Sequence, residues 1–132
     1  MIPNRLVALR ICSEVLVYFH RVRRESILVA YLDSGNICMN VEVRFGGPTS
    51  VRFPTDEIIG IAERIGASKI LVAHNHPDDR PTPSDADVQH AAALWSTAEA
   101  SNVKVVDDIV WCHGGVKSVL NTQRFKSLLR TY

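Results

Sequence analysis

The chain has 132 residues, of which 46% are hydrophobic, and its formal net charge is +1. This length is sufficient for one hydrophobic core and too short for two ordinary domains, so we expect a single domain over residues 1–132. A charge this close to zero excludes a strong overall field towards nucleic acid or membranes, although residues 21–24 contain three arginines.

Three cysteines, at positions 12, 38 and 112, are widely spaced and show no Cys-x-x-Cys pairing. Their apolar neighbours predict reduced residues of the core. The chain has no charged-then-apolar N-terminal signal, and no apolar stretch approaches the roughly 18 residues that a membrane span needs. We therefore expect a cytoplasmic protein that makes no membrane contact.

The first third of the chain predicts a helix followed by a β-hairpin. Apolar residues recur every three or four positions over residues 3–20, which indicates an amphipathic helix. Residues 26–32 and 37–45 are rich in β-branched and large apolar side chains, and Asp33-Ser34-Gly35-Asn36 separates them. These four residues are typical of a turn, so the two segments are predicted to pair as antiparallel strands.

The middle of the chain predicts a helix that leads into a buried strand. Residues 50–53 form a short third strand at most, and a helix begins next, with Thr55 as its expected N-cap. Gly66 fits the left-handed position after the helix. The apolar run that follows, over residues 69–73, is typical of a central strand.

The last part of the chain completes an alternation of helices and strands. This order predicts an α/β sandwich in which helices flank a mixed β-sheet. Asp107-Asp108 is expected to form a turn between two strands. The predicted elements are a helix over 85–100, strands over 103–106, 109–112 and 116–120, and a terminal helix over 123–129.

The segment from His74 to Asp87 has the pattern of a metal site. His74 and His76 lie two apart at the end of the predicted strand, so their side chains project to the same side. Prolines at 77, 81 and 83 prevent a helix until Ser84, a favourable N-cap, which places Asp87 in the first helical turn. Two histidines and one carboxylate are the ligands of a catalytic zinc. Ser84 and Asp87 also fit a simple capping box.

This segment resembles the motif of the JAB/MPN (JAMM) metalloproteases: His-x-His-Pro, a Ser eight residues after the second His, and an Asp three residues further. The sequences His-Asn-His-Pro and Pro-Thr-Pro-Ser-x-x-Asp are most similar to the RadC branch, and residues 25–33 and 106–110 extend the similarity. The resemblance implies the cytidine-deaminase-like fold of that family. Two departures are Asp78-Asp79 in place of the usual Ser-Gly, and Asp107-Asp108 in place of the usual Asp-His.

The resemblance also implies catalytic roles. Glu25 matches the water-activating glutamate that serves as general base and acid, and Ser84 matches the serine that donates to the oxyanion. His74, His76 and Asp87 match the zinc ligands. Glu57 is the alternative base; it falls in a first helical turn, where the helix dipole favours a carboxylate without any catalytic role. The residues alone do not distinguish Glu25 from Glu57 as the general base.

The function implied is that of a zinc-dependent metallopeptidase or isopeptidase, in which a metal-activated water attacks an amide bond. Its expected partner is a protein or peptide, such as a ubiquitin-like conjugate, without strong intrinsic nucleic-acid binding. The alternatives are a catalytically silent JAB interaction module and a DNA-repair-associated accessory protein. Structural roles are expected for Asn75, His20, His90 and His113.

Overall fold

The computed structural model describes residues 25–45, 53–76, 80–112 and 115–131. The helix predicted over residues 3–20, with Cys12 and His20, lies outside these residues, as do 21–24, 50–52 and His113. No helix in the described ranges is long and apolar enough to cross a membrane. The elements are β1 (Ser26–Leu32), β2 (Cys38–Phe45), α2 (Thr55–Ile65), β3 (Lys69–Asn75), α3 (Asp85–Ala100), β4 (Lys104–Cys112), β5 (Gly115–Ser118) and α4 (Gln123–Leu129).

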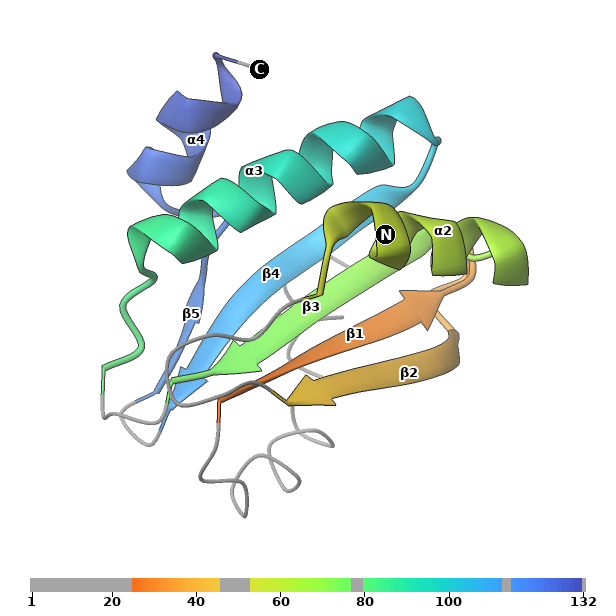
Figure 1. Cartoon of the computed structure of the whole chain (residues 1–132), viewed down its shortest axis with the longest axis horizontal. Helices are drawn as coiled ribbons and strands as arrows, with labels where there is room; N and C mark the ends of the chain where they lie inside the picture. Colours follow the sequence, from red (N-terminus) through yellow and green to blue (C-terminus); the bar gives the residue numbers. More distant parts are fainter. Residues whose placement is uncertain (1–24, 46–52, 77–79, 113–114, 132) are drawn as a thin grey trace.

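The five strands form one mixed sheet in the order β2-β1-β3-β4-β5 (Figure 1). Strand β3 pairs in parallel with β4, whereas the other neighbours are antiparallel. The predicted hairpin of β1 and β2 is confirmed, and Asp33 holds its turn by accepting hydrogen bonds from the backbone N–H groups of Gly35 and Ile37. The predicted α/β class is therefore confirmed, with β3 in the centre of the sheet.

Helices α2 and α3 cover one face of the sheet, and α4 lies beside α3 (Figure 1). The core on this face joins Tyr31 and Val72 of the strands to Ile58 of α2 and Leu94 of α3. Alternate strand residues, such as Leu28 and Leu71, form a second buried cluster. Because β3 is buried on both faces, its sequence is a continuous apolar run, as expected of a central strand.

The turn predicted at Asp107-Asp108 is wrong. Strand β4 is continuous from Lys104 to Cys112, and both aspartates are buried within it. The pairing of β3 with β4 shifts so that Val106 is the extra residue of a bulge. Asp107 is satisfied inside the sheet, because its Oδ1 accepts hydrogen bonds from Asp108 N and from Ser118 Oγ of β5. These partners outweigh the local turn preference of the Asp-Asp pair.

Two smaller predictions also need correction. Thr55 is the first helical residue of α2 rather than its N-cap; Pro54 precedes it, and no side chain caps this end. Gly66 has φ 75°, so its predicted left-handed conformation is confirmed. Cys112 is buried as expected, but Cys38 is exposed because it begins the outer strand β2.

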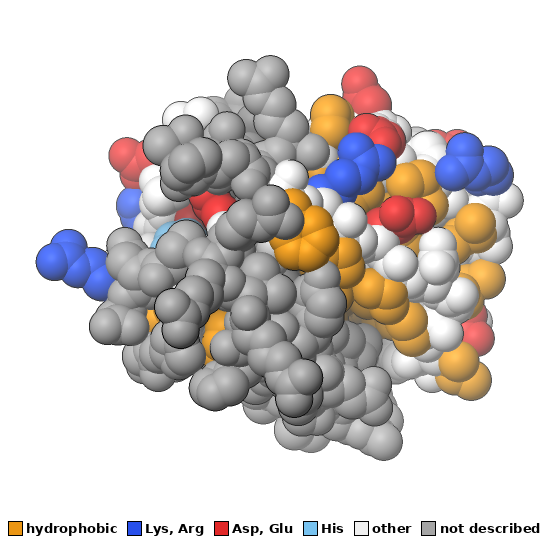
Figure 2. All heavy atoms as spheres, turned by 60° about the horizontal axis from the view of Figure 1, so that its bottom comes forward, with side chains coloured by type: hydrophobic (Ala, Val, Ile, Leu, Met, Phe, Trp, Pro, Cys, Tyr) orange, Lys and Arg blue, Asp and Glu red, His pale blue; other side chains and the backbone are white. Residues whose placement is uncertain are grey.

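Strand β2 differs from the buried centre of the sheet because it has no neighbour on its outer side within the described part of the chain. Figure 2 brings this side of the molecule forward and shows hydrophobic side chains at the surface. The large exposed ones on or next to β2 are Ile37, Met39, Val41 and Phe45. Two histidines gather instead at the carboxyl end of β3.

Candidate metal centre

Three side chains meet at the carboxyl end of β3. His74 is near the end of this strand, His76 directly follows it, and Asp87 is in the first turn of α3. One ligand atom from each lies within 4.8 Å of the other two, which makes the group a candidate metal site. The structure thus brings together the three residues that the motif predicted, although metal binding by them stays a prediction.

Asp87 faces both histidines. Its Oδ1 lies 3.0 Å from His74 Nε2, and its Oδ2 lies 3.0 Å from His76 Nε2. The same Oδ2 accepts a hydrogen bond from Ser84 N, while Ser84 Oγ accepts one from Asp87 N. This is a complete capping box. The capping interpretation and the metal interpretation are therefore compatible, because the cap holds the carboxylate in place beside the histidines.

His76 is oriented by two backbone contacts. Its backbone N–H donates to Trp111 O of β4, and its Nδ1 lies 3.1 Å from Arg80 O. A carbonyl can only accept, so Nδ1 carries the proton in this contact and Nε2 faces Asp87. Metal-ligating histidines are commonly oriented in this way through their second ring nitrogen.

The Nε2 of His74 lies at the centre of the group. It is close to Asp87 Oδ1, but the geometry is not that of a hydrogen bond, and this buried atom has no hydrogen-bond partner among the described residues. A divalent cation between His74, His76 and Asp87 would give this nitrogen a partner, so the residues fit a metal ion.

Electrostatics in the metal-free site favour protons at the same atoms. Burial lowers the pKa of His74, but Asp108 and Asp87 outweigh it and raise that pKa to about 10. The hydrogen bond with Asp87 raises the pKa of His76. Burial acts to raise the pKa of Asp87, but the two histidines hold it well below its usual range. Metal ions and protons therefore compete for this site.

Asn75 anchors the start of β1, which directly follows Glu25. Its side chain accepts hydrogen bonds from Ser26 N at 2.7 Å and from Ser26 Oγ at 3.0 Å. Glu25, which is partly buried, directly precedes Ser26. The antiparallel pairing of β1 with β3 reaches Ile27 and His74, so Glu25 lies two residues beyond the last pair, at the end of the sheet where the histidines lie. Glu25 thus enters the sheet beside the site, while its catalytic role stays a prediction.

Glu57 and His90 are engaged elsewhere. Glu57, in the first turn of α2, forms an ion pair with Arg44 of β2, and both side chains are exposed. The Nε2 of His90 lies 2.9 Å from Phe53 O, which joins α3 to the segment before α2. Neither residue belongs to the group of possible ligands formed by the described residues. The structural role expected for His90 agrees with this contact.

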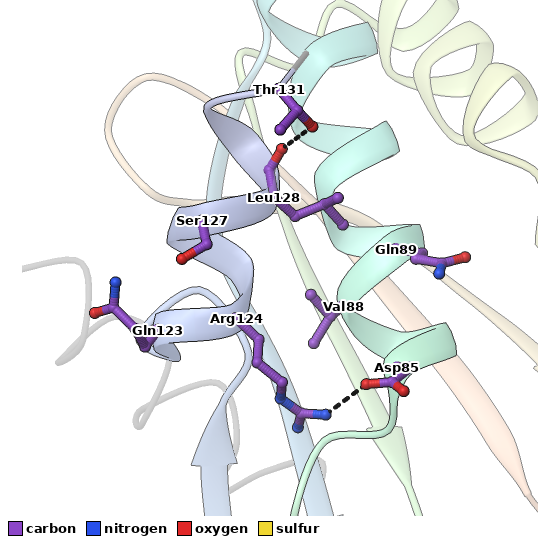
Figure 3. Close-up of a pocket in the computed structure, with 8 residues that line it drawn as sticks. All are labelled: Asp85, Val88, Gln89, Gln123, Arg124, Ser127, Leu128 and Thr131. Carbon is purple, nitrogen blue, oxygen red and sulfur yellow. Dashed lines mark hydrogen bonds and ion pairs between the residues drawn. The ribbon is translucent and has the colours of Figure 1, made fainter.

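Arg124 of α4 contacts the loop before α3, which its sequence position did not predict. Its guanidinium contacts Asp85 Oδ1 at 2.7 Å and also donates to Pro83 O. These partners lie on either side of Ser84, and Figure 3 shows Arg124 reaching Asp85 across the groove between α3 and α4. Arg124 therefore supports the loop from which the cap and Asp87 emerge. It lies 37 positions after Asp87, so no local spacing could have indicated the contact.

The sequence is similar to known proteins over most of its length. Residues 6–124 match the family described as RadC-like JAB domain. UPF0758 proteins from Carboxydothermus hydrogenoformans and Psychrobacter sp. are 32% and 35% identical over 67% and 68% of this chain, covering 39% and 42% of the relatives. A UPF0758 protein from Enterococcus faecalis is 27% identical over 89% of the chain and 51% of the relative. The chain thus spans about half the length of these relatives, or less.

Proposed function

Because the chain belongs to the RadC-like JAB domain family, we propose that it is a zinc-dependent metallohydrolase that cleaves an amide bond in a protein or peptide. The observation that carries the proposal is the convergence of His74, His76 and Asp87 within 4.8 Å, with a buried histidine nitrogen that lacks a hydrogen bond. Two imidazoles and one carboxylate leave a fourth position open, as in catalytic zinc sites. The intact group favours an enzyme over a catalytically silent module.

When bound, zinc supplies a Lewis acid that polarises the scissile carbonyl and lowers the pKa of a water molecule. In the proposed reaction, Glu25 accepts the proton of the attacking water and passes it to the leaving nitrogen. The anchor between Asn75 and Ser26 keeps the start of β1 beside the site. This contact supports Glu25 rather than Glu57 as the proton carrier.

Ser84 is suited to stabilise charge on the carbonyl oxygen of the substrate. Its Oγ accepts the capping hydrogen bond from Asp87 N through a lone pair, so its own proton stays available for donation. A donor held in place before the reaction is effective where negative charge develops. One serine can therefore serve both the helix cap and the proposed oxyanion contact.

The decisive experiment measures the metal content of the purified chain by mass spectrometry. We expect one zinc per chain, none in the His74→Ala, His76→Ala double variant, and full content in the control His90→Ala, whose imidazole contacts Phe53 O instead. Hydrolysis of a library of peptide and isopeptide substrates is then assayed with and without a chelator. Stoichiometric zinc in the double variant, or hydrolysis that the chelator leaves unchanged, would overturn the proposal.

A further inference from the structure

We propose that Asp108 is a positioning residue of the metal centre, holding His74 from the side opposite Asp87; this inference rests on metal binding at the proposed site. Asp108 Oδ1 lies 3.6 Å from His74 Nδ1. Asp108 is only 1% exposed, and its Oδ1 has no hydrogen-bond partner among the described residues. A buried carboxylate is strongly unfavourable without a partner, and the His74 imidazole is the ionisable group beside this oxygen.

The backbone of Asp108 is fixed on both sides. Its N–H donates to Asp107 Oδ1 at 2.8 Å, and its carbonyl accepts from Val119 N at 2.7 Å. The parallel register places Asp108 opposite Val72, two residues before His74, so the carboxylate lies on the same face of the sheet as the imidazole. Asp108 is therefore held beside His74 by the sheet itself rather than by a flexible loop.

The two ring nitrogens of His74 need different partners if this residue binds a metal. Nε2 faces Asp87 and must present a lone pair, so Nδ1 must carry the proton. A carboxylate next to Nδ1 accepts that proton in a hydrogen bond, which fixes both the tautomer and the plane of the ring. We expect the separation of 3.6 Å to shorten when Nε2 binds the ion.

The two histidines thus have different supports. His76 Nδ1 faces the neutral carbonyl oxygen of Arg80, whereas His74 Nδ1 faces a carboxylate. A carboxylate increases the basicity of the imidazole more than a carbonyl does and strengthens it as a ligand. The RadC resemblance does not supply this carboxylate, because that family usually has histidine at the position of Asp108. The support is a feature of this chain.

The test compares zinc affinities of the full chain and three variants by competition with a chromophoric chelator. Asp108→Ala should weaken binding roughly 10- to 100-fold. Asp108→Asn should lie between Asp108→Ala and the natural protein, because its amide oxygen can still accept the Nδ1 proton. The matched control is Asp107→Asn, whose amide oxygen can still accept from Asp108 N and Ser118 Oγ, so it should bind zinc within about threefold of the natural protein.

The absorption spectrum of the cobalt-substituted protein distinguishes a positioning role of Asp108 from a merely structural one, because it reports the geometry of the ligands. Asp108→Ala should change this spectrum, Asp108→Asn should partly restore it, and Asp107→Asn should leave it unchanged. If Asp108→Ala does not fold, Asp108→Asn alone decides, because it keeps the size of the side chain. Natural affinity and spectrum in Asp108→Asn would then overturn the inference. If the natural protein and both Asp108 variants bind zinc equally well, this inference is wrong and the proposed function still stands. If the natural protein binds no zinc, the proposed function is wrong as well.

Discussion

His74 lies between two carboxylates that come from different kinds of structure. Asp87 belongs to the capped first turn of α3, and Asp108 lies within the buried strand β4. Their side chains are 14% and 2% exposed, respectively. The Asp87 side chain is therefore partly accessible to solvent, whereas the Asp108 side chain is enclosed. One imidazole thus has a partly accessible side for a ligand and an enclosed side for its support.

The largest expected effect follows from removing the carboxylate on the helix side. Asp87→Ala removes a proposed ligand, both histidine contacts and the acceptor of the Ser84 N–H. Metal binding should be lost, and the metal-free protein should lose on the order of 1 to 3 kcal/mol of unfolding free energy. Metal analysis and denaturant unfolding in chelator measure the two effects. Zinc retained by Asp87→Ala would show that Asp87 is not a ligand of the ion.

The next effect concerns the glutamate beside the site. Glu25→Gln keeps the size of the side chain but removes the basic oxygen, so turnover should fall roughly 10²-fold or more. Zinc content and unfolding free energy should stay near those of the natural protein, because Glu25 is not among the proposed ligands. Single-turnover hydrolysis of a substrate identified in the library assay gives the rate. A variant that keeps its turnover while binding zinc would exclude Glu25 as the general base.

The Asp87 side of His74 was predictable from the sequence, whereas the Asp108 side was not. The histidine pair and the Ser84–Asp87 cap follow from local spacing, because a strand alternates its side chains and a capping box spans one helical turn. Asp108 did not follow, because two adjacent aspartates favour a turn locally while Ser118, 11 residues away, satisfies Asp107 inside the sheet. The bulge at Val106 also interrupts the simple alternation. Long-range pairing decided this part of the fold.

The pH dependence of the metal-free protein tests both carboxylates together. The folded pKa of His74 is raised to about 10 from 6.5, so the folded protein keeps a proton that the unfolded chain releases. Stability from this group is full below about pH 6.5 and is lost as the pH rises towards about 10. Zinc affinity should change in the opposite direction, because metal binding displaces protons.

Urea unfolding in chelator at several pH values between about 6.5 and 10 measures this effect. His74→Gln is the control, because it removes this imidazole and should weaken the dependence, leaving the part that comes from His76. Unfolding free energy that is constant or rises over this range in the natural protein would contradict the assignment of opposing charges around His74.

The smallest effect is expected at Glu57, which resembles Asp87 in position but not in surroundings. Both are acidic residues in the first turn of a helix. Asp87 is turned towards two histidines by a capping box, whereas α2 has no side-chain cap and Glu57 pairs with Arg44 in an exposed position. Screened surface pairs contribute little, and the Arg44 guanidinium keeps its contact with the Phe53 ring when the pair is lost. Glu57→Gln should therefore bind zinc normally and keep turnover within about twofold of the natural rate.

Glu57→Gln and Glu25→Gln each remove one carboxylate, so the two variants are matched when they are measured on the same substrate. A large loss of turnover in Glu57→Gln with no loss in Glu25→Gln would transfer the role of general base to α2.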